Sequence, residues 1–425
     1  MSRNRSNVTQ LPRISLLVLL AAAVLLPPVR TGAATNDGHA PIVIQSDADF
    51  TNCACVTSGA GTTASPFVIG PWSINNVDGD AVFVDGTYLT KSFVLWNLTV
   101  AGNSGSTQRG VALRNINPTG VQNIVAEVKG RQTSIQTANI GILVEFSSYV
   151  TLDGGGENPN GAGIGNTGAG TINKNVSGAI DIENSSYITV KGWQLSANGG
   201  DHQPDWLTLD PSLNFWGVGG VRMFGVSYSL VDHNAANNCT DVSFSVFNSS
   251  HNTLSNNTAD YPFTTNFIVT DGSAYNLLSG NVAGTADFIG YLVADPLPGT
   301  PTLTAFGPTH ENILTGNISH SDGPTGNEVK AGIVPSFVAD VVVLNGTYGN
   351  QLINNQGRSS SALPSFIWAQ AVPNSGTPIG VDTAPPVLDC NVTASYGGEG
   401  GLGNLNGNVW QGNAFRTISP CLPPQ

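Results

Sequence analysis

The side chains best suited to chemistry are carboxylates and bases that recur with regular spacing between residues 141 and 235. Asp153, Lys191 and Asp232 take the same position in three copies of a short motif. A paired acid and base can hydrolyse a glycosidic bond, and a base beside a bound cation can remove a proton next to a uronate carboxylate. The candidate catalytic residues are Asp153, Asp232, Lys191, Glu183, Asp181 and Arg222.

A segment between two of these copies adds aromatic rings and further acids. It spans residues 199–216 and is an insertion that we expect to project beside the repeat. Aromatic rings stack on sugars and carboxylates accept hydrogen bonds from hydroxyl groups. The candidate substrate-binding residues are Trp206, Trp216, Tyr187, Tyr228 and Asp205.

A metal site is a further hypothesis for this region. If the insertion folds back over its own repeat, His202 and Asp201 approach His233. The chain has 6 His, 5 Cys and 2 Met, a poor supply of the ligands that copper prefers. Carboxylate-rich turns favour Ca²⁺ over copper. An exposed histidine with no metal role is the competing interpretation.

The elements that position these residues follow from an internal repeat, Asn-x-aliphatic-x-x-Asn. Clear copies occupy residues 252–257, 276–281, 312–317 and 350–355, and a late copy at 408–413 has Trp410 in the aliphatic position. Weaker copies begin at Ser92, Val150, Ile188 and Ser229. Each follows a short β-rich segment, so the repeat indicates stacked coils of short strands with excursions between them.

One coil can be built from elementary geometry. Alternate residues point inward, so Leu254, Leu278 and their equivalents stack at the ~4.8 Å strand spacing. The terminal Asn recurs at a turn, where its amide can bond the same amide in the next coil. The fold class predicted is all-β, a right-handed single-stranded parallel β-helix of about 9 to 11 coils with an Asn ladder.

The same stacking sets the distances between candidate catalytic groups. Asp153 and Asp232 lie two coils apart, ~9.6 Å along the axis. That separation is at the upper edge of the ~6.5–9.5 Å found in inverting glycosidases. For a lyase, Lys191 or Arg222 would be the base. The competing interpretation is an ordinary surface ion ladder, which stabilises little.

An aromatic stripe immediately precedes the repeat in five successive coils. Its members are Tyr149, Tyr187, Tyr228, His251 and Tyr275. It could be a platform for sugars, or a structural ladder in which each ring packs on the next. The pattern favours the structural ladder.

Two stretches resemble a known family. Residues 65–74, preceded by 58–63, look like the opening segment of many exported β-helix proteins, and residues 249–257 resemble the repeat of the NosD periplasmic copper-protein-maturation family. The wider superfamily is the pectate-lyase-like one, and the resemblance spans residues 41–357. It implies the fold and an exported protein. The Asp motifs of polygalacturonases and the Asp/Arg motifs of pectate lyases are not found in this chain.

Composition and the first residues indicate export. Arg3, Arg5 and Arg13 precede the apolar run 14–26, and 32–34 are small residues suited to cleavage. The run is short for a membrane span, which needs ~20 residues. The net charge is −13, which disfavours nucleic acid and anionic membranes. We expect a secreted or periplasmic monomer, without membrane insertion, whose partner is a polysaccharide.

The domain boundaries follow from these signals. We expect a signal peptide at 1–34, a cap segment at 35–65, the β-helix at 66–360, and an irregular strap with a terminal coil and cap at 361–425. Cys390 and Cys421 are suited to a disulfide that holds the last segment. Cys53 and Cys55 are so close in sequence that a bond between them is expected to be strained, and Cys239 is expected to be a buried, inert thiol.

Three functions remain open from the sequence. The first is a polysaccharide-binding protein, of glycoside hydrolase or polysaccharide lyase type if it is catalytic, with its site over residues 141–235. The second is a NosD-like accessory protein that handles metal. The third is a non-catalytic surface or matrix protein in which the stack itself is the function.

Overall fold

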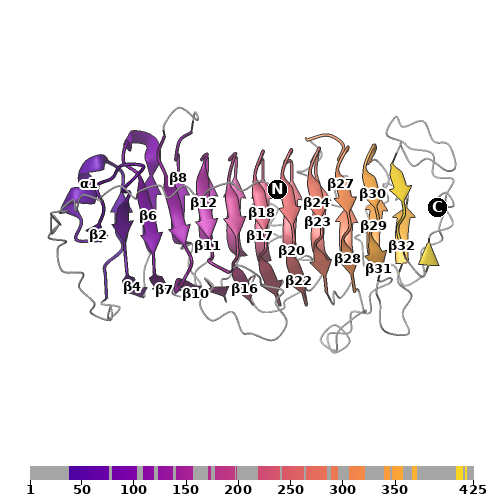
Figure 1. The fold of residues 1–425 in the computed structure, drawn as a ribbon, viewed down its shortest axis with the longest axis horizontal. Helices are drawn as coiled ribbons and strands as arrows, with labels where there is room; N and C mark the ends of the chain where they lie inside the picture. The colour runs from indigo at the N-terminus through magenta and orange to yellow at the C-terminus, as the bar shows by residue number, and fades with distance from the viewer. Residues whose placement is uncertain are drawn as a thin grey trace, which may run out of the picture. The chain divides into compact units, whose positions relative to one another are not determined.

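The computed structural model shows a stack of short parallel strands (Figure 1). It describes residues 38–75, 79–102, 109–118, 123–136, 140–156, 171–173, 178–196, 198, 219–239, 242–262, 265–284, 289–294, 306–320, 339–344, 347–357, 366–370, 408–414 and 417–418. All of these belong to one compact unit, Asn36–Gln425. The predicted signal peptide lies outside the described residues. None of the described helices is long and apolar enough to cross a membrane.

The strands form three sheets, each with one strand per coil (Figure 1). Sheet 1 contains β1 (Ile42–Ile44), β5 (Val82–Asp85), β8 (Arg109–Arg114), β11 (Ile140–Glu145), β14 (Gly178–Glu183), β17 (Gly219–Phe224), β20 (Val242–Phe247), β23 (Thr265–Thr270), β26 (Ile289–Val293), β29 (Ala339–Leu344), β32 (Phe366–Gln370) and β34 (Thr417–Ile418).

Sheet 2 contains β2 (Val56–Ser58), β3 (Phe67–Ile69), β6 (Phe93–Trp96), β9 (Ala126–Lys129), β12 (Val150–Asp153), β15 (Thr189–Lys191), β18 (Leu230–Asp232), β21 (Thr253–Ser255), β24 (Leu277–Ser279), β27 (Ile313–Thr315), β30 (Gln351–Ile353) and β33 (Val409–Gln411). Sheet 3 contains β4 (Trp72–Asn75), β7 (Leu98–Ala101), β10 (Ser134–Gln136), β13 (Thr171–Asn173), β16 (Gln194–Ser196), β19 (Ala235–Asn237), β22 (Thr258–Asp260), β25 (Val282–Ala283), β28 (Ile318–Ser319) and β31 (Gln356–Gly357).

The chain visits the three sheets in a fixed order and then repeats the circuit one strand higher. Within the described residues every pairing between strands is parallel except β2 with β3, which is antiparallel. The predicted parallel β-helix is therefore confirmed. Sheets 1 and 2 have 12 described strands each and sheet 3 has 10, so the described strands make ten complete coils, which agrees with the 9 to 11 coils expected.

The interior is a set of stacked apolar side chains. Leu254, Leu278, Leu314 and Leu352 are at most 2% exposed and lie in register on β21, β24, β27 and β30. Phe244, Phe267 and Tyr291 form a second column on sheet 1, with 4.9 Å between neighbouring ring centroids. Each coil buries its apolar face only against the coils above and below, so the stack stabilises itself as an array.

Asparagine forms two ladders, whereas the sequence predicted one. The terminal Asn of each repeat is in a ladder as expected, and so is the first Asn. The backbone N–H and side-chain amide of Asn257 both donate to Oδ1 of Asn281 at 3.0 Å, and the amide also donates to the Val231 carbonyl at 2.8 Å. These side chains are buried, so each bond replaces one that water supplies in the unfolded chain.

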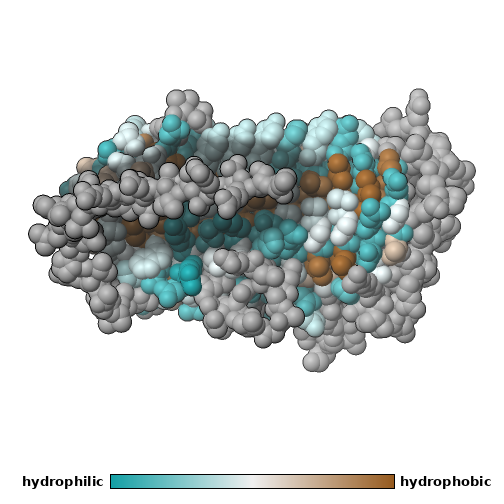
Figure 2. All heavy atoms as spheres, viewed as in Figure 1, coloured by the Kyte–Doolittle hydropathy of each residue, from teal (hydrophilic) through white to brown (hydrophobic). Residues whose placement is uncertain are grey.

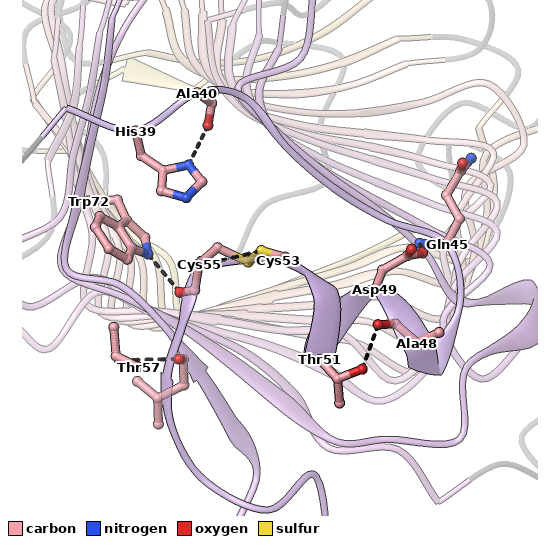
Figure 3. Close-up of a disulfide and its surroundings, with 11 residues drawn as sticks. His39, Ala40, Gln45, Ala48, Asp49, Thr51, Cys53, Cys55, Thr57 and Trp72 are labelled. Atoms are coloured by element: carbon pink, nitrogen blue, oxygen red, sulfur yellow. Dashed lines mark hydrogen bonds between the residues drawn. A yellow bond between two sulfur atoms is a disulfide. The ribbon is translucent and has the colours of Figure 1, made fainter.

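A short cap closes the N-terminal coils (Figure 3). Helix α1 (Asp47–Asn52) begins after Ser46, whose backbone N–H donates to the Asp49 carboxylate at 2.8 Å. Cys53 and Cys55 are bonded to each other after the helix ends, although a strained bond was expected for this spacing. Trp72 donates from its indole N–H to the Cys55 carbonyl at 2.7 Å and so anchors the loop to sheet 3. A 3₁₀ turn, η1 (Gly86–Tyr88), follows β5.

Two further cysteine predictions concern other parts of the chain. Cys239 is a buried free thiol, and burial raises its pKa to about 12, so it is inert at neutral pH as predicted. Cys390 and Cys421 lie outside the described residues. Within the segment expected to be an irregular strap, β32 continues sheet 1 by pairing with β29.

The Asn ladder predicts a specific loss of stability. Asn257→Ala removes the acceptor of both the backbone N–H and the side-chain amide of Asn234. Each buried group left unsatisfied costs about 1–3 kcal/mol, so urea unfolding should give a free energy of unfolding lower by at least this amount. Asn237→Ala, at an exposed position of β19, is the control. An equal loss in both variants would show that the ladder contributes nothing of its own.

Candidate functional site

The six predicted catalytic side chains lie on two neighbouring sheets. Asp181 and Glu183 on β14 and Arg222 on β17 belong to sheet 1. Asp153, Lys191 and Asp232 belong to sheet 2 and are aligned on β12, β15 and β18, as the repeat predicts. A tight turn at 184–188 connects the two sheets within one coil. The two groups are therefore separate sites, and each must be judged by its own contacts.

Arg222 is the centre of the sheet 1 group. Its guanidinium donates from Nε and Nη2 to the two carboxylate oxygens of Asp181 at 2.8 and 2.6 Å, and from Nη2 to Glu183. Asp181 and Arg222 are only 4% and 7% exposed. Burial disfavours the charged guanidinium, but the charge and hydrogen bond of Asp181, together with the charge of Glu183, outweigh burial and raise the pKa of Arg222. Arg222 is thus a permanent cation that fixes both carboxylates.

Glu183 is the accessible member of this group. Its side chain is 27% exposed, whereas the Asp181 side chain is 5% exposed. Burial, followed by the charge of Asp181, raises the pKa of Glu183, and Glu145 adds to the effect, although Arg222 opposes it. A carboxyl group with a raised pKa, at a place where solvent or substrate can reach it, is suited to general acid catalysis.

Glu145 and Arg114 extend the group by two coils. Glu145 lies in register with Glu183 on the adjacent strand, and Arg114 pairs with Glu145 at 2.6 Å. One strand spacing is ~4.8 Å, close to the ~5–5.5 Å between the two carboxyl groups of retaining glycosidases. The sequence analysis did not single out Arg114, because the repeat is too degenerate near β8 to align it.

The sheet 2 group is a ladder of alternating charges. Lys129, Asp153, Lys191 and Asp232 lie in register on four successive coils. The Lys191 ammonium is 3.0 Å from an Asp153 carboxylate oxygen, and both side chains are substantially exposed. This is the arrangement of a solvated ion ladder, in which each pair stabilises by less than about 1 kcal/mol.

Asp232 is held in its charged form. Burial alone would raise its pKa, but hydrogen bonds from Ser255, His233 and Asn256 lower it. Ser255 Oγ is 2.6 Å from one carboxylate oxygen and His233 Nδ1 is 2.6 Å from the other. A carboxylate with a lowered pKa cannot serve as a general acid near neutral pH, so Asp232 is suited to the role of base or anion.

The predicted metal site cannot be assembled from the described residues. His202 and Asp201 lie outside them, and His233 directs Nδ1 to the Asp232 carboxylate. Among the residues that the structure describes, no group of three or more His, Cys, Asp or Glu side chains is arranged to hold a metal ion.

Of the five predicted substrate-binding residues, two lie within the described residues and three lie outside them. Trp206, Trp216 and Asp205 lie outside the described residues. Tyr187 and Tyr228 belong to the aromatic ladder, which we define as Tyr149, Tyr187, Tyr228, His251 and Tyr275. Their ring centroids are 4.9, 5.4, 4.9 and 5.0 Å apart along the stack.

Backbone strain and ring stacking act in opposite directions on the stability of this ladder. All five residues have positive φ, from 51° to 58°, where a bulky side chain costs of order 1–3 kcal/mol. Each stacked ring pair stabilises the fold by about 0.5–1.5 kcal/mol. Stacking therefore offsets part of the backbone strain, and the burial of about half of each tyrosine adds to this offset. Over the coloured part of the face in Figure 2, hydrophilic residues are interspersed with hydrophobic ones.

The fold defines the class of protein as a parallel β-helix with an Asn ladder and an outward-facing cluster of charged residues. No protein-family model matches the chain, and no curated protein is significantly similar to it in sequence.

The two acidic residues predict opposite effects of pH on stability. Glu183 has a raised pKa in the folded state, so its ionisation destabilises the fold, and this penalty grows as pH rises above about 4.5, its ordinary value. Asp232 has a lowered pKa, so its contribution to stability is present above about 3.8 and is lost as pH falls below that value.

Thermal unfolding between pH 3 and pH 8 measures this directly. At pH 7 Glu183→Gln should raise the Tm and Asp232→Asn should lower it, and both differences should shrink toward zero at the acidic end. A Glu183→Gln variant that is less stable than the wild type at pH 7 would contradict the charge balance described for the Arg222 cluster.

Proposed function

We propose that this protein is an exported polysaccharide-binding protein that cleaves its substrate at the outer face of sheet 1, with Glu183 as the general acid. The observation that carries the proposal is the raised pKa of a partly exposed carboxyl group beside a buried arginine. Groups perturbed by burial and by a specific charged partner are enriched at catalytic sites. The resemblance to the pectate-lyase-like superfamily supports a polysaccharide as the substrate class.

The arrangement favours hydrolysis over elimination at sheet 1. As the base of a lyase Arg222 would have to lose its proton, but it is engaged by Asp181 and Glu183 and its pKa is raised. Glu183 would instead give its proton to the leaving glycosidic oxygen. Glu145, about one strand spacing away, would be the second carboxylate, and this separation favours retention of configuration.

The sheet 2 ladder supplies the second candidate for the reacting pair. Asp153 and Asp232 lie two coils apart, as an inverting pair would require, but Lys191 lies between them and is paired with Asp153. The NosD-like metal function and the non-catalytic structural role rest on the repeat alone, and no contact among the described residues favours either. Export to the periplasm or the extracellular medium remains part of the proposal.

Activity assays with matched variants test the proposal. The mature protein is incubated with a panel of neutral and acidic polysaccharides, and new reducing ends and the absorbance of unsaturated uronates are both measured. We expect new reducing ends without unsaturated product. Loss of a general acid typically costs 10²–10⁴-fold, so Glu183→Gln should lower turnover by about this factor.

Asp153→Asn and Asp232→Asn are the matched controls, because they remove carboxylates from the neighbouring sheet. Both should retain most of the activity. If they abolish turnover while Glu183→Gln does not, the reacting pair is on sheet 2. If no polysaccharide in the panel yields either product, the proposed activity is wrong.

A further inference from the structure

The aromatic ladder is a contiguous exposed strip of large rings. The four tyrosines are 46% to 52% exposed, although they are among the largest side chains in the protein. Isolated exposed apolar residues are ordinary on a protein surface, but a continuous row is characteristic of a binding surface. The row follows the stacking direction across five coils.

The turn itself does not require aromatic residues. In the next two coils Glu311 and Gly349 have the same backbone conformation, with φ of 53° and 64°, while His310 and Tyr348, one residue earlier, continue the ring contacts from Tyr275. Gly adopts this region freely, whereas a bulky residue there is an outlier that the surrounding structure must hold. Aromatic residues therefore occupy five strained positions whose backbone conformation Glu and Gly also adopt in this chain, and strained positions concentrate at functional sites.

The geometry of the rings defines how a ligand would meet them. Neighbouring rings are close to parallel, with interplanar angles of 4° to 27°. Backbone hydrogen bonds between the turns, such as Tyr187 N–H to the Ser227 carbonyl at 3.0 Å, hold this spacing. Because each inner ring has a neighbour on both faces, a ligand meets ring edges and phenol hydroxyls at intervals of one strand spacing, ~4.8 Å.

Charge restricts the ligand to an uncharged one. Glu145 and Glu183 each lie four residues before a ladder tyrosine, and Glu311 accepts a hydrogen bond from Tyr275. No Lys or Arg occurs in the sequence between Arg222 and Lys330, and the net charge of the chain is −13. A polyanion would be repelled by these carboxylates.

We infer that the aromatic ladder is the docking surface for a linear, uncharged polysaccharide that lies parallel to the stacking axis, with each ring edge against one successive sugar. The inference deepens the proposed function and rests on it for the class of ligand. Because Glu145 and Glu183 end the strands that lead into the Tyr149 and Tyr187 turns, a chain bound to the ladder passes beside the sheet 1 cluster.

Affinity electrophoresis tests the inference, with soluble glucomannan and xyloglucan as uncharged probes and polygalacturonate as the anionic one. The uncharged probes should retard the wild-type protein and polygalacturonate should not. The double variant Tyr187→Asn/Tyr228→Asn removes two rings while Asn accepts the same backbone conformation. It should bind the uncharged probes at least tenfold more weakly, with an unchanged circular dichroism spectrum.

Tyr261→Asn is the matched control, because Tyr261 is 48% exposed at φ 53° but is not a member of the ladder. It should bind like the wild type. If the double variant does not fold, the two single variants are measured instead. The inference is overturned if neither uncharged probe retards the wild type, or if variants lacking ladder rings bind as tightly as Tyr261→Asn.

The same variants separate this inference from the proposed cleavage. Glu183→Gln should bind the uncharged probes normally. If it loses turnover while the ladder variants bind and cleave normally, the ladder inference alone fails. If ladder variants lose binding and the wild type cuts no probe, the proposed cleavage alone fails.

Discussion

The register between successive coils is the constraint on which the rest of this structure depends. Backbone hydrogen bonds align the strands, and two buried columns of asparagine amides lock the turns between them. A shift of one residue would exchange the inward and outward faces of a strand and expose its stacked leucines. Every outward side chain therefore has fixed neighbours directly above and below it, although these are distant in sequence.

The same register produces two different electrostatic surfaces. On sheet 1, carboxylates follow one another at Glu145 and Glu183. Arg114 pairs with Glu145, whereas Glu183 shares the buried Arg222 with Asp181. On sheet 2, acidic and basic residues alternate from Lys129 to Asp232, and most of these side chains face solvent. Like charges on adjacent, partly buried strands raise a carboxyl pKa, whereas alternating exposed charges largely cancel. The chemistry proposed for sheet 1 follows from this contrast.

The turn between these sheets carries the aromatic ladder. The backbone strain of its residues is informative because other residues can occupy the same turn position with less strain. Later coils use Glu311 or Gly349 at the same position without interrupting sheet 2. A continuous row of half-exposed rings at strained backbone positions is the basis for inferring an external contact. It also places an ordered row of polar ring edges next to the charged cluster.

The sequence by itself determined the coil, because a repeat of apolar and Asn positions has few other ways to bury its apolar face. It also placed Asp153, Lys191 and Asp232 in one column, since equivalent positions of a repeat must stack. Only the tertiary structure decided that Asp181, Glu183 and Arg222 form a separate cluster on another sheet, and that Arg114 holds Glu145. It also showed that the first Asn of the clear repeats forms a ladder of its own, and that Cys53 bonds Cys55. The reason is physical. A repeat determines which residues stack, but burial, side-chain direction and charge pairing depend on contacts around the turn. They also depend on neighbouring coils, and in some of these the repeat is too degenerate to be aligned from the sequence.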